Sequence, residues 1–142
     1  MPFLTRQPID VAEWHAAAVD EGDGASVEFL GIVRSHEGGR LIECLQYEAY
    51  EPMAERLIAR LIAEANARWR LHQVKVRHRL GRVAGGEVAV LVGVRSAHRE
   101  EAFAACRFLI DAIKQDVPIW KSALGSNGDV LETVCAHGRQ TH

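Results

Sequence analysis

Residues 96 to 121 read SAHREEAFAACRFLIDAIKQDVPIWK, and this stretch decides how the rest of the chain is organised. Ser96 suits an N-cap, and Glu100 and Glu101 fall in the first turn, where the positive end of the helix dipole favours carboxylates. Pro118 lacks an N–H and disfavours helical geometry before it, so we expect the helix to end near Val117. Apolar residues at three- and four-residue steps predict one buried stripe: Phe103, Cys106, Ile110, Ile113 and Val117.

Four side chains in or beside this helix are cationic or can become cationic. Arg99 and Lys114 come round to nearly the same side at 3.6 residues per turn, and the turn at Pro118 lets Lys121 fold back beside Lys114. His98 and Arg99 open the helix, where free backbone N–H groups attract an anion. These residues predict a site for a small anion. The helix pattern alone favours a simpler interpretation, a solvated face whose cations extend over the edge of the core.

The remaining elements follow from hydrophobic periodicity and turn residues. Alternation with a period of two predicts strands, a 3.6-residue stripe predicts a helix, and Gly, Pro and Asp clusters mark the turns. Asp10 and Glu13 form a capping box for the first helix. We expect helices at about residues 11–19 and 52–69, and strands at about residues 25–33, 41–50, 73–80, 87–94 and 130–134.

The first two of these strands carry a further expectation. The turn at residues 37–39 suggests that the strands at 25–33 and 41–50 form an antiparallel hairpin. Arg34 follows the first strand, beside this glycine-rich turn. It can either meet a ligand there or pair with a nearby carboxylate such as Glu48, which is the common fate of an isolated strand arginine.

The two strands that precede residue 96 have different patterns. The strand at 73–80 alternates and should be half buried, and we expect His78 to be a hydrogen-bonded histidine at the core edge rather than a ligand. The strand at 87–94 is almost continuously apolar, which suits the centre of a sheet. It leads directly to Ser96, so the end of this strand lies at the candidate site.

Composition limits the class of protein. The 142 residues, 48% of them hydrophobic, suffice for one compact domain over residues 1–142. The net charge of −2, from 17 basic and 19 acidic residues, argues against bulk binding to nucleic acid. No apolar stretch approaches the length that spans a bilayer, and no signal peptide is evident. We therefore expect a soluble, cytoplasmic protein with no membrane or nucleic-acid partner.

Cysteine and histidine spacing bears on metals and disulfides. Cys44, Cys106 and Cys135 are widely separated and form no Cys-x-x-Cys pair, which argues against a disulfide framework or a zinc knuckle. The seven histidines include no His-Glu-x-x-His spacing. We expect neither a metal site nor a cofactor.

Four segments together resemble a known family: FLGIVRSH at 29–36, YEAYEPMA at 47–54, HRLG at 78–81 and the stretch at 96–121. They resemble the MoaE family, the large catalytic subunit of molybdopterin synthase, over about residues 10 to 121. The most specific part is Ser-Ala-His-Arg followed, at the family's spacing, by Ala-Phe, Asp, Lys and Pro-x-Trp-Lys. The resemblance implies an α+β fold of the α/β-hammerhead type, with a mostly antiparallel sheet and two or three packed helices.

The resemblance also implies an activity and partners. The implied reaction is the insertion of two sulfurs into cyclic pyranopterin monophosphate, which makes the dithiolene of molybdopterin in molybdenum cofactor biosynthesis. The implied sulfur donor is a thiocarboxylate at the Gly-Gly C-terminus of a small ubiquitin-like subunit, so no thiol of this chain need act as nucleophile. The implied assembly is a homodimer of large subunits, each bearing one small subunit, which makes a heterotetramer.

The site residues that the resemblance implies have suitable chemistry. Arg34, His98 and Arg99 are implied to hold the phosphate and pterin, since guanidinium and imidazole groups donate to anionic oxygens. Lys114 is implied to donate and accept protons as sulfur replaces oxygen, and Lys121 to hold the thiocarboxylate or the developing negative charge. The two lysine roles can be exchanged. Backbone N–H groups complete the implied substrate contacts: Val33, Ser122 and Ala123.

The chain departs from the family pattern after Lys121. Family members usually continue with a charged stretch and a Trp after the terminal turn, whereas residues 122–124 here are Ser-Ala-Leu and residues 130–131 are Val-Leu. Arg139 is the candidate for the basic residue that the family's tail contributes to a neighbouring site. Two other classes stay open: a non-catalytic module that binds an anion or nucleotide, and a purely structural oligomer.

Overall fold

The computed structural model describes residues 2–37, 39–125 and 130–135. Within them the helices are α1 (Val11–Ala16), α2 (Glu51–Arg68) and α3 (Arg99–Asp116). The strands are β1 (Leu4–Thr5), β2 (Ala25–Ile32), β3 (His36–Glu37), β4 (Arg40–Leu41), β5 (Cys44–Ala49), β6 (Leu71–Arg79), β7 (Gly81–Ala84), β8 (Val88–Ser96), β9 (Ile119–Leu124) and β10 (Val130–Cys135).

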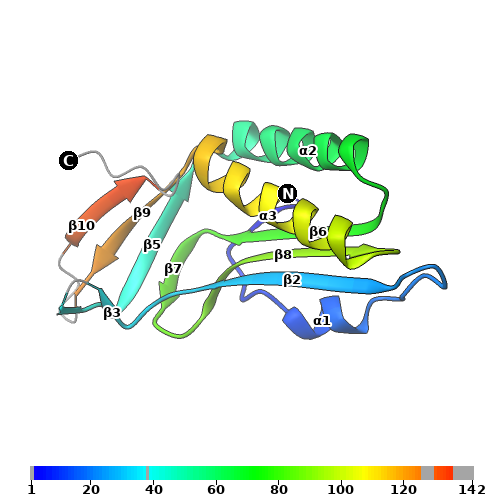
Figure 1. The fold of residues 1–142 in the computed structure, drawn as a ribbon. Coiled ribbons are helices and arrows are strands. Elements are labelled where there is room, and N and C mark those ends of the chain that lie inside the picture. Colours follow the sequence, from blue (N-terminus) through cyan, green and yellow to red (C-terminus); the bar gives the residue numbers. More distant parts are fainter. Residues whose placement is uncertain (1, 38, 126–129, 136–142) are drawn as a thin grey trace.

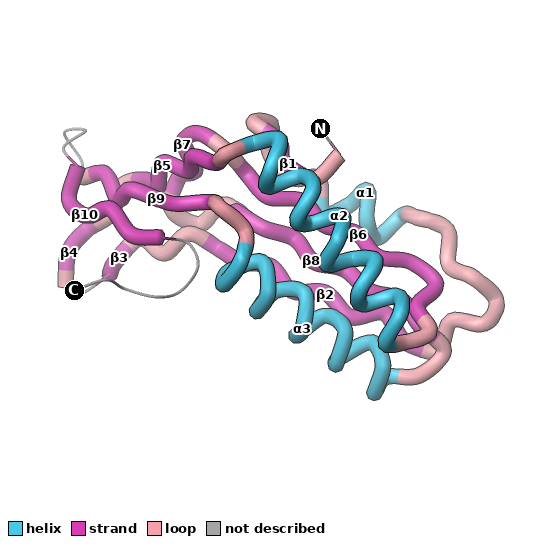
Figure 2. Tube along the Cα trace, turned by 90° about the horizontal axis from the view of Figure 1, so that it is seen from above, coloured by secondary structure: helices cyan, strands magenta, loops and turns pink. Residues whose placement is uncertain are grey.

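The strands form two four-stranded sheets and a short ribbon. The first sheet has the order β1-β6-β8-β2 and the second the order β10-β9-β5-β7, while β3 and β4 pair only with each other. Every pair is antiparallel except β1 with β6. The second sheet continues from one end of the first (Figures 1 and 2). This arrangement confirms the expected α+β fold with mostly antiparallel sheets.

Helices cover both faces of the first sheet (Figure 1). α2 and α3 lie on one face, where Ile58 of α2, Leu109 of α3 and Val92 of β8 are fully buried in one core. α1 lies on the other face, where the ring of Trp14 packs on Gly93 of β8. A Cβ at Gly93 would lie 2.5 Å from this ring, so only glycine permits the close approach.

α3 forms where the sequence predicts it, with three details confirmed and two wrong. Glu100 and Glu101 occupy the first turn, Lys114 the last, and the helix stops at the cap residue Val117. The expected N-cap is wrong, because Ser96 is the buried last residue of β8. Its hydroxyl donates to the carbonyl of the true N-cap, His98, at 2.7 Å.

The expected burial of Phe103 is also wrong, since this side chain is 61% exposed. Cys106, Ile110, Ile113 and Val117 are buried as expected. The buried stripe is shifted toward small residues, because alanines let α3 approach β8 and β2 closely. The buried residues of the helix are Ala102, Ala105, Cys106, Leu109, Ile110 and Ile113.

The predicted hairpin between the strands at 25–33 and 41–50 is wrong. β2 pairs with β8, whereas β5 pairs with β7 and β9 in the other sheet. The segment between β2 and β5 forms only the short ribbon of β3 and β4, in which His36 lies opposite Leu41. β2 pairs with the long apolar strand β8, which lies beneath α3. Burial of apolar side chains beneath α3 outweighs pairing of β2 with β5, the nearer strand in sequence.

The other sequence predictions are largely confirmed. β8 lies between β6 and β2, as expected of a central strand, and α2, β6 and β10 form close to the predicted ranges. α1 is shorter than predicted, although Asp10 accepts the cap hydrogen bond from the Glu13 N–H at 3.0 Å. Most of the predicted turn at 125–129, and Arg139, lie outside the described residues. No helix in the described part of the chain is long and apolar enough to cross a bilayer.

Candidate active site

Lys114 and Lys121 lie at the junction of the two sheets. The Nζ of Lys114, in the last turn of α3, is 5.7 Å from the centre of the Phe29 ring on β2. Lys121 lies on β9 directly opposite Tyr47 of β5. Opposed residues of an antiparallel pair direct their side chains to the same face. Lys121 therefore shares a face with Tyr47, the face that also carries the buried Ile119.

His78 links the surroundings of the two lysines. Its ring makes an edge-to-face contact with the ring of Tyr47, with centroids 5.0 Å apart. Burial lowers the pKa of His78 to about 4, although a hydrogen bond to the Arg79 backbone acts in the other direction. The nearby charge of Lys114 lowers this pKa further, which places Lys114 within electrostatic range of His78. The lysine site, as we call it, comprises Lys114, Lys121, His78, Tyr47 and Phe29.

The low pKa of His78 predicts a pH-dependent stability. Between about pH 4 and pH 6.5 the unfolded chain binds a proton at this position that the folded chain does not. The free energy of unfolding should therefore fall by roughly 3 kcal/mol as the pH drops through this window, and be fully retained above it. Urea unfolding at several pH values measures the effect. The His78→Phe variant should lose this part of the slope; an unchanged slope in the variant would contradict the assignment.

Arg34 and Val33 lie on the same side of the molecule as the lysine site. β2 starts beside the beginning of α3, because Ala25 pairs with Ser96, and it runs past Phe29 toward Arg34, which is exposed. The backbone N–H of Val33 donates to the Glu87 carbonyl at 3.0 Å. Its role as a substrate donor would require breaking this bond.

Ser122 and Ala123 continue the strand that carries Lys121. β9 is an inner strand, paired with β5 on one side and β10 on the other. The N–H groups of inner strands are directed at neighbouring strands. Ser122 and Ala123 therefore lie next to the lysine site, but their backbone donors belong to the sheet.

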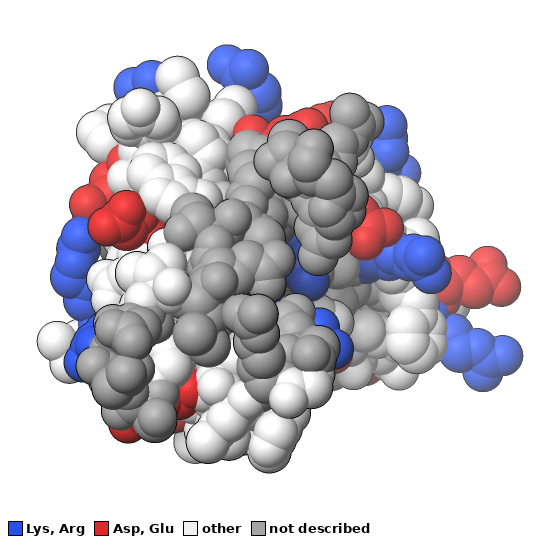
Figure 3. Space-filling view, turned by 90° about the vertical axis from the view of Figure 1, so that its left-hand side faces the viewer, with Lys and Arg blue, Asp and Glu red and all other residues white. Residues whose placement is uncertain are grey.

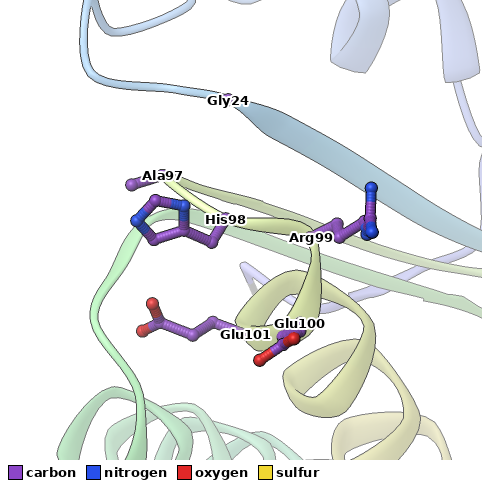
Figure 4. A pocket seen from close by; sticks show the side chains of 6 residues that line it. All are labelled: Gly24, Ala97, His98, Arg99, Glu100 and Glu101. Atoms are coloured by element: carbon purple, nitrogen blue, oxygen red, sulfur yellow. The ribbon is translucent and has the colours of Figure 1, made fainter.

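His98 and Arg99 lie at the far end of α3. They line a shallow pocket of about 470 Å³ together with Gly24, Ala97, Glu100 and Glu101 (Figure 4). In Figure 4 their side chains extend in opposite directions from the start of the helix. Sixteen residues separate His98 from Lys114, which corresponds to about 24 Å along a helix. A single chain thus does not bring His98 and Arg99 together with the lysine site.

The pocket at the start of α3 has mixed charge. Glu100 and Glu101 contribute two carboxylates beside the guanidinium of Arg99 and the imidazole of His98. Glu101 is engaged, because its carboxylate accepts a hydrogen bond of 2.9 Å from the backbone N–H of Arg70. The free N–H groups of the first turn still favour an anion. The pocket therefore combines N–H groups that attract an anion with two carboxylates that oppose it.

Charges on the surface around the second sheet are also mixed. Figure 3 views the molecule from that side and shows Lys and Arg side chains interspersed with Asp and Glu side chains. A visible surface of mixed charge suits a polyanion less well than a broad basic face would. In the part of the chain that the structure describes, no group of three His, Cys, Asp or Glu side chains is placed to hold a metal.

Sequence reasoning did not select Phe29, Tyr47 or His78 as members of the site. They come from β2, β5 and β6, and only the packing of the two sheets brings them together. One signal was present. Each is the first residue of a segment on which the family resemblance rests: 29–36, 47–54 and 78–81.

The combination of two joined sheets with two long helices on one face defines a recognised class of fold. Molybdopterin synthase from Staphylococcus aureus has a similar structure, with a TM-score of 0.82 and 36% identity over 89% of this chain and 92% of that one. A complex of subunits 1 and 2 of molybdopterin-converting factor from Helicobacter pylori shares the fold, with a TM-score of 0.77 and 24% identity over 97% and 91% of the two chains.

The chain belongs to the MoaE protein family, whose model matches residues 4–116. Catalytic subunits of molybdopterin synthase are among its relatives. The one from Nostoc sp. is 40% identical over 88% of this chain and 76% of its own length, and the one from Salmonella typhimurium 43% over 86% and 82%. The one from Arabidopsis thaliana is 43% identical over 75% of this chain, which spans 54% of that relative's length. Fold and sequence thus agree on membership of the MoaE family.

Proposed function

We propose that the chain transfers sulfur from the C-terminal thiocarboxylate of a small ubiquitin-like subunit to cyclic pyranopterin monophosphate, and so forms the dithiolene of molybdopterin. For each sulfur, a carbon–sulfur bond to the pterin side chain replaces a carbon–oxygen bond. The donor's acyl–sulfur bond is replaced by an acyl–oxygen bond, and the donor ends as a carboxylate. The net exchange changes no oxidation state, so it needs protons and charge stabilisation but no redox partner.

The convergence of Lys114 and Lys121 on the His78–Tyr47 pair carries this proposal. Sulfur-for-oxygen exchange needs a group that protonates the departing oxygen and a cation that stabilises the developing negative charge. Two lysines in one site supply both functions. Lys114 is assigned the proton transfers and Lys121 the contact with the thiocarboxylate, and the two roles can be exchanged.

The thiols of the chain support an external sulfur donor. Cys106 is buried beneath α3, and burial raises its pKa to about 11, so it stays protonated and unreactive at neutral pH. Cys44 is also buried. Neither of the two thiols that the structure describes is therefore suited to supply sulfur, which supports a donor on a partner. The Helicobacter pylori structure, titled a complex of subunits 1 and 2 of molybdopterin-converting factor, supports a separate small subunit. We place this reaction in the cytoplasm.

The length of α3 supports a homodimer in which both chains build each site. The phosphate-binding candidates, His98 and Arg99, lie about 24 Å from Lys114. An antiparallel two-fold pairing along α3 brings the start of one helix beside the end of the other. Phe103, which is 61% exposed on α3, then gains a buried position, and β2 is the edge strand on this side of the sheet. Arg34 joins the lysine site from its own chain.

Mixing two inactive variants tests this shared site. Arg99→Ala and Lys114→Ala should each abolish turnover as homodimers. When they are unfolded and refolded together, half of the dimers become mixed, and each mixed dimer has one site with both residues intact. Activity should then return to about a quarter of the wild-type value.

Two controls accompany the mixing experiment. Lys114→Ala mixed with Lys121→Ala must stay inactive, because each site then lacks one lysine whichever chains combine. If Arg99→Ala and Lys114→Ala also fail to complement, although mass spectrometry shows mixed dimers, the shared site is disproved.

The activity itself is tested by combining the chain with a small subunit carrying a C-terminal thiocarboxylate and with cyclic pyranopterin monophosphate. We expect a dithiolene product, detected after oxidation to a fluorescent pterin, and conversion of the thiocarboxylate to a carboxylate in the mass spectrum. A small subunit that ends in an ordinary carboxylate should give no product. No product from a donor that works with another catalytic subunit would refute the proposal.

A further inference from the structure

The imidazole of His78 lies beneath the lysine site in one defined hydrogen-bonding state. Its Nδ1 is 2.8 Å from the backbone carbonyl oxygen of Arg79. A carbonyl oxygen only accepts, so Nδ1 carries the hydrogen. His78 is 6% exposed, and burial keeps the ring neutral at physiological pH because its pKa is about 4. A neutral ring with a protonated Nδ1 has a lone pair on Nε2, which therefore acts as an acceptor.

The ring is also held in one orientation. Tyr47 packs against it edge to face at an interplanar angle of 77°. The backbone N–H of His78 donates to the carbonyl of Phe3, the residue just before β1, which pairs with β6. Nδ1 faces the strand's own backbone, so Nε2 is directed away from it. Rotation would break the hydrogen bond to Arg79 and the contact with Tyr47 together.

The charged and titratable groups around His78 come from few elements. α3 contributes Lys114, β9 contributes Lys121 through its pairing opposite Tyr47, and β5 contributes the phenol of Tyr47. β1 and β8 place Leu4 and Val90 opposite His78 in the sheet.

The next residue, Arg79, is directed elsewhere. Its guanidinium donates to Glu87 at 3.4 Å and to the Arg82 carbonyl at 3.0 Å. α2 contributes the carboxylate of Glu55, which accepts hydrogen bonds from the backbone N–H groups of Phe3 and Leu4, and Leu4 lies opposite His78. The charge that acts on the pKa of His78 is that of Lys114.

We propose that His78 is a positioning residue for the lysine site, and that its neutral Nδ1–H tautomer offers an acceptor to an ammonium group of that site. The inference rests on the proposed function. A site with two ammonium groups gains nothing from a third positive charge, and an uncharged acceptor orients a lysine without neutralising it. A carboxylate in this place would pair with the lysine and hold it away from the substrate. The neutral ring leaves the positive charge available to the thiocarboxylate.

The tautomer is measured on the free wild-type protein, without substrate or small subunit. Long-range ¹⁵N–¹H spectra of histidine-labelled protein at pH 7 should show one ring with a protonated Nδ1 and an unprotonated Nε2, which persists on titration to pH 5. Its signal is assigned by its absence from His78→Gln. A charged ring at pH 7, or a protonated Nε2, would overturn the proposal even if every variant failed to fold.

Kinetics of His78→Phe and His78→Gln test the positioning role. Phenylalanine keeps the ring packing on Tyr47 but removes both nitrogens, and it should lower kcat about 10- to 100-fold, the loss of one hydrogen bond to a charged group, with KM within about twofold. Glutamine offers an amide oxygen and should recover a large part of kcat. His15→Phe, at an exposed position on α1, is the matched control and should retain wild-type kcat.

An NMR measurement that does not require turnover distinguishes a failure of this inference from a failure of the proposed function. The chain has only three lysines, Lys75, Lys114 and Lys121, so ¹³Cε-labelled lysine gives an interpretable spectrum. A hydrogen bond to His78 fixes the environment of the ammonium group, so His78→Phe should shift the Cε resonance of a site lysine, His78→Gln should shift it less, and the Lys75 resonance should stay in place. If the wild type is inactive but this resonance shifts, the proposed function fails alone. If the wild type is active while kcat and the resonance are unchanged in His78→Phe, the positioning role fails alone.

Discussion

Replacing Lys114 or Lys121 with alanine should lower kcat about a thousandfold, with a much smaller change in KM. Both lysines lie at the junction of the sheets, one 5.7 Å from the Phe29 ring and the other opposite Tyr47. Removing a general acid–base group, or the cation that stabilises a developing charge, costs a factor of about 10² to 10⁴ in kcat. Single-turnover assays with thiocarboxylated small subunit measure the chemical step directly.

A matched control exists because the chain has one other lysine. Lys75 lies on β6 and pairs at 3.8 Å with Glu13 of α1, so Lys75→Ala removes the same side chain from a different place. Its kcat should stay within about twofold of the wild type, since an exposed ion pair contributes little. Binding of the cyclic pterin by calorimetry decides between enzyme and binding module. Substrate affinity that is largely retained in Lys114→Ala and Lys121→Ala would place the lysines in the chemical step. Wild-type protein that binds the cyclic pterin without turnover, and variants that lose affinity in proportion to the lost charge, would favour the non-catalytic anion-binding module.

The second large effect concerns stability. Arg95 on β8 is 3% exposed, and its guanidinium lies 4.1 Å from the centre of the Trp14 ring. It donates to the carbonyls of Trp14 and Ala17 at the end of α1, at 2.8 and 3.1 Å, and to the side chain of Gln73 at 2.8 Å. The Trp14 carbonyl also accepts a hydrogen bond from the Ala17 N–H at 3.3 Å. This one side chain therefore fastens α1 to the sheet.

Arg95→Ala should lower the free energy of unfolding by roughly 3–5 kcal/mol, because a hydrogen bond to a charged group contributes about 1.5–3 kcal/mol and the acceptors of Ala17 and Gln73 both lose one. Urea unfolding followed by tryptophan fluorescence measures the change, and near-ultraviolet circular dichroism shows whether Trp14 loses its fixed environment. Arg60→Ala, exposed on α2, should stay within about 0.5 kcal/mol of the wild type. If both variants unfold at the wild-type urea concentration, Arg95 does not fasten α1.

Much of the candidate site could be predicted because it depends on short-range rules. The dipole-complementing charges of α3 and the stop before Pro118 are local effects, and they place Lys114 and Lys121 on either side of one turn. The resemblance then directed attention to Arg34, His98 and Arg99, whose contacts with substrate remain predictions. The N-cap was misplaced because β8 extends through Ser96, where pairing with Ala25 overrides the local preference for a cap.

The wrong predictions for Phe103 and for the hairpin show the limit of rules that depend on residues close in sequence. The 3.6-residue pattern fits Phe103 on a buried stripe, but the sheet selects the neighbouring face, where alanines allow a closer approach. The turn at 37–39 suits a hairpin, yet β2 and β5 each find larger apolar partners in different sheets. Periodicity shows that a face is apolar and not which surface will cover it.

The sequence by itself determined the helices, the central strand, the turn at Pro118 that lies between Lys114 and Lys121, and the family. These follow from interactions between residues close along the chain and from motifs that can be read directly. Only the tertiary structure decided that Phe29, Tyr47 and His78 surround the two lysines, and that α3 holds His98 and Arg99 at its far end. Contacts between residues far apart in the chain depend on which surfaces bury the most apolar area together, and that is a property of the whole fold.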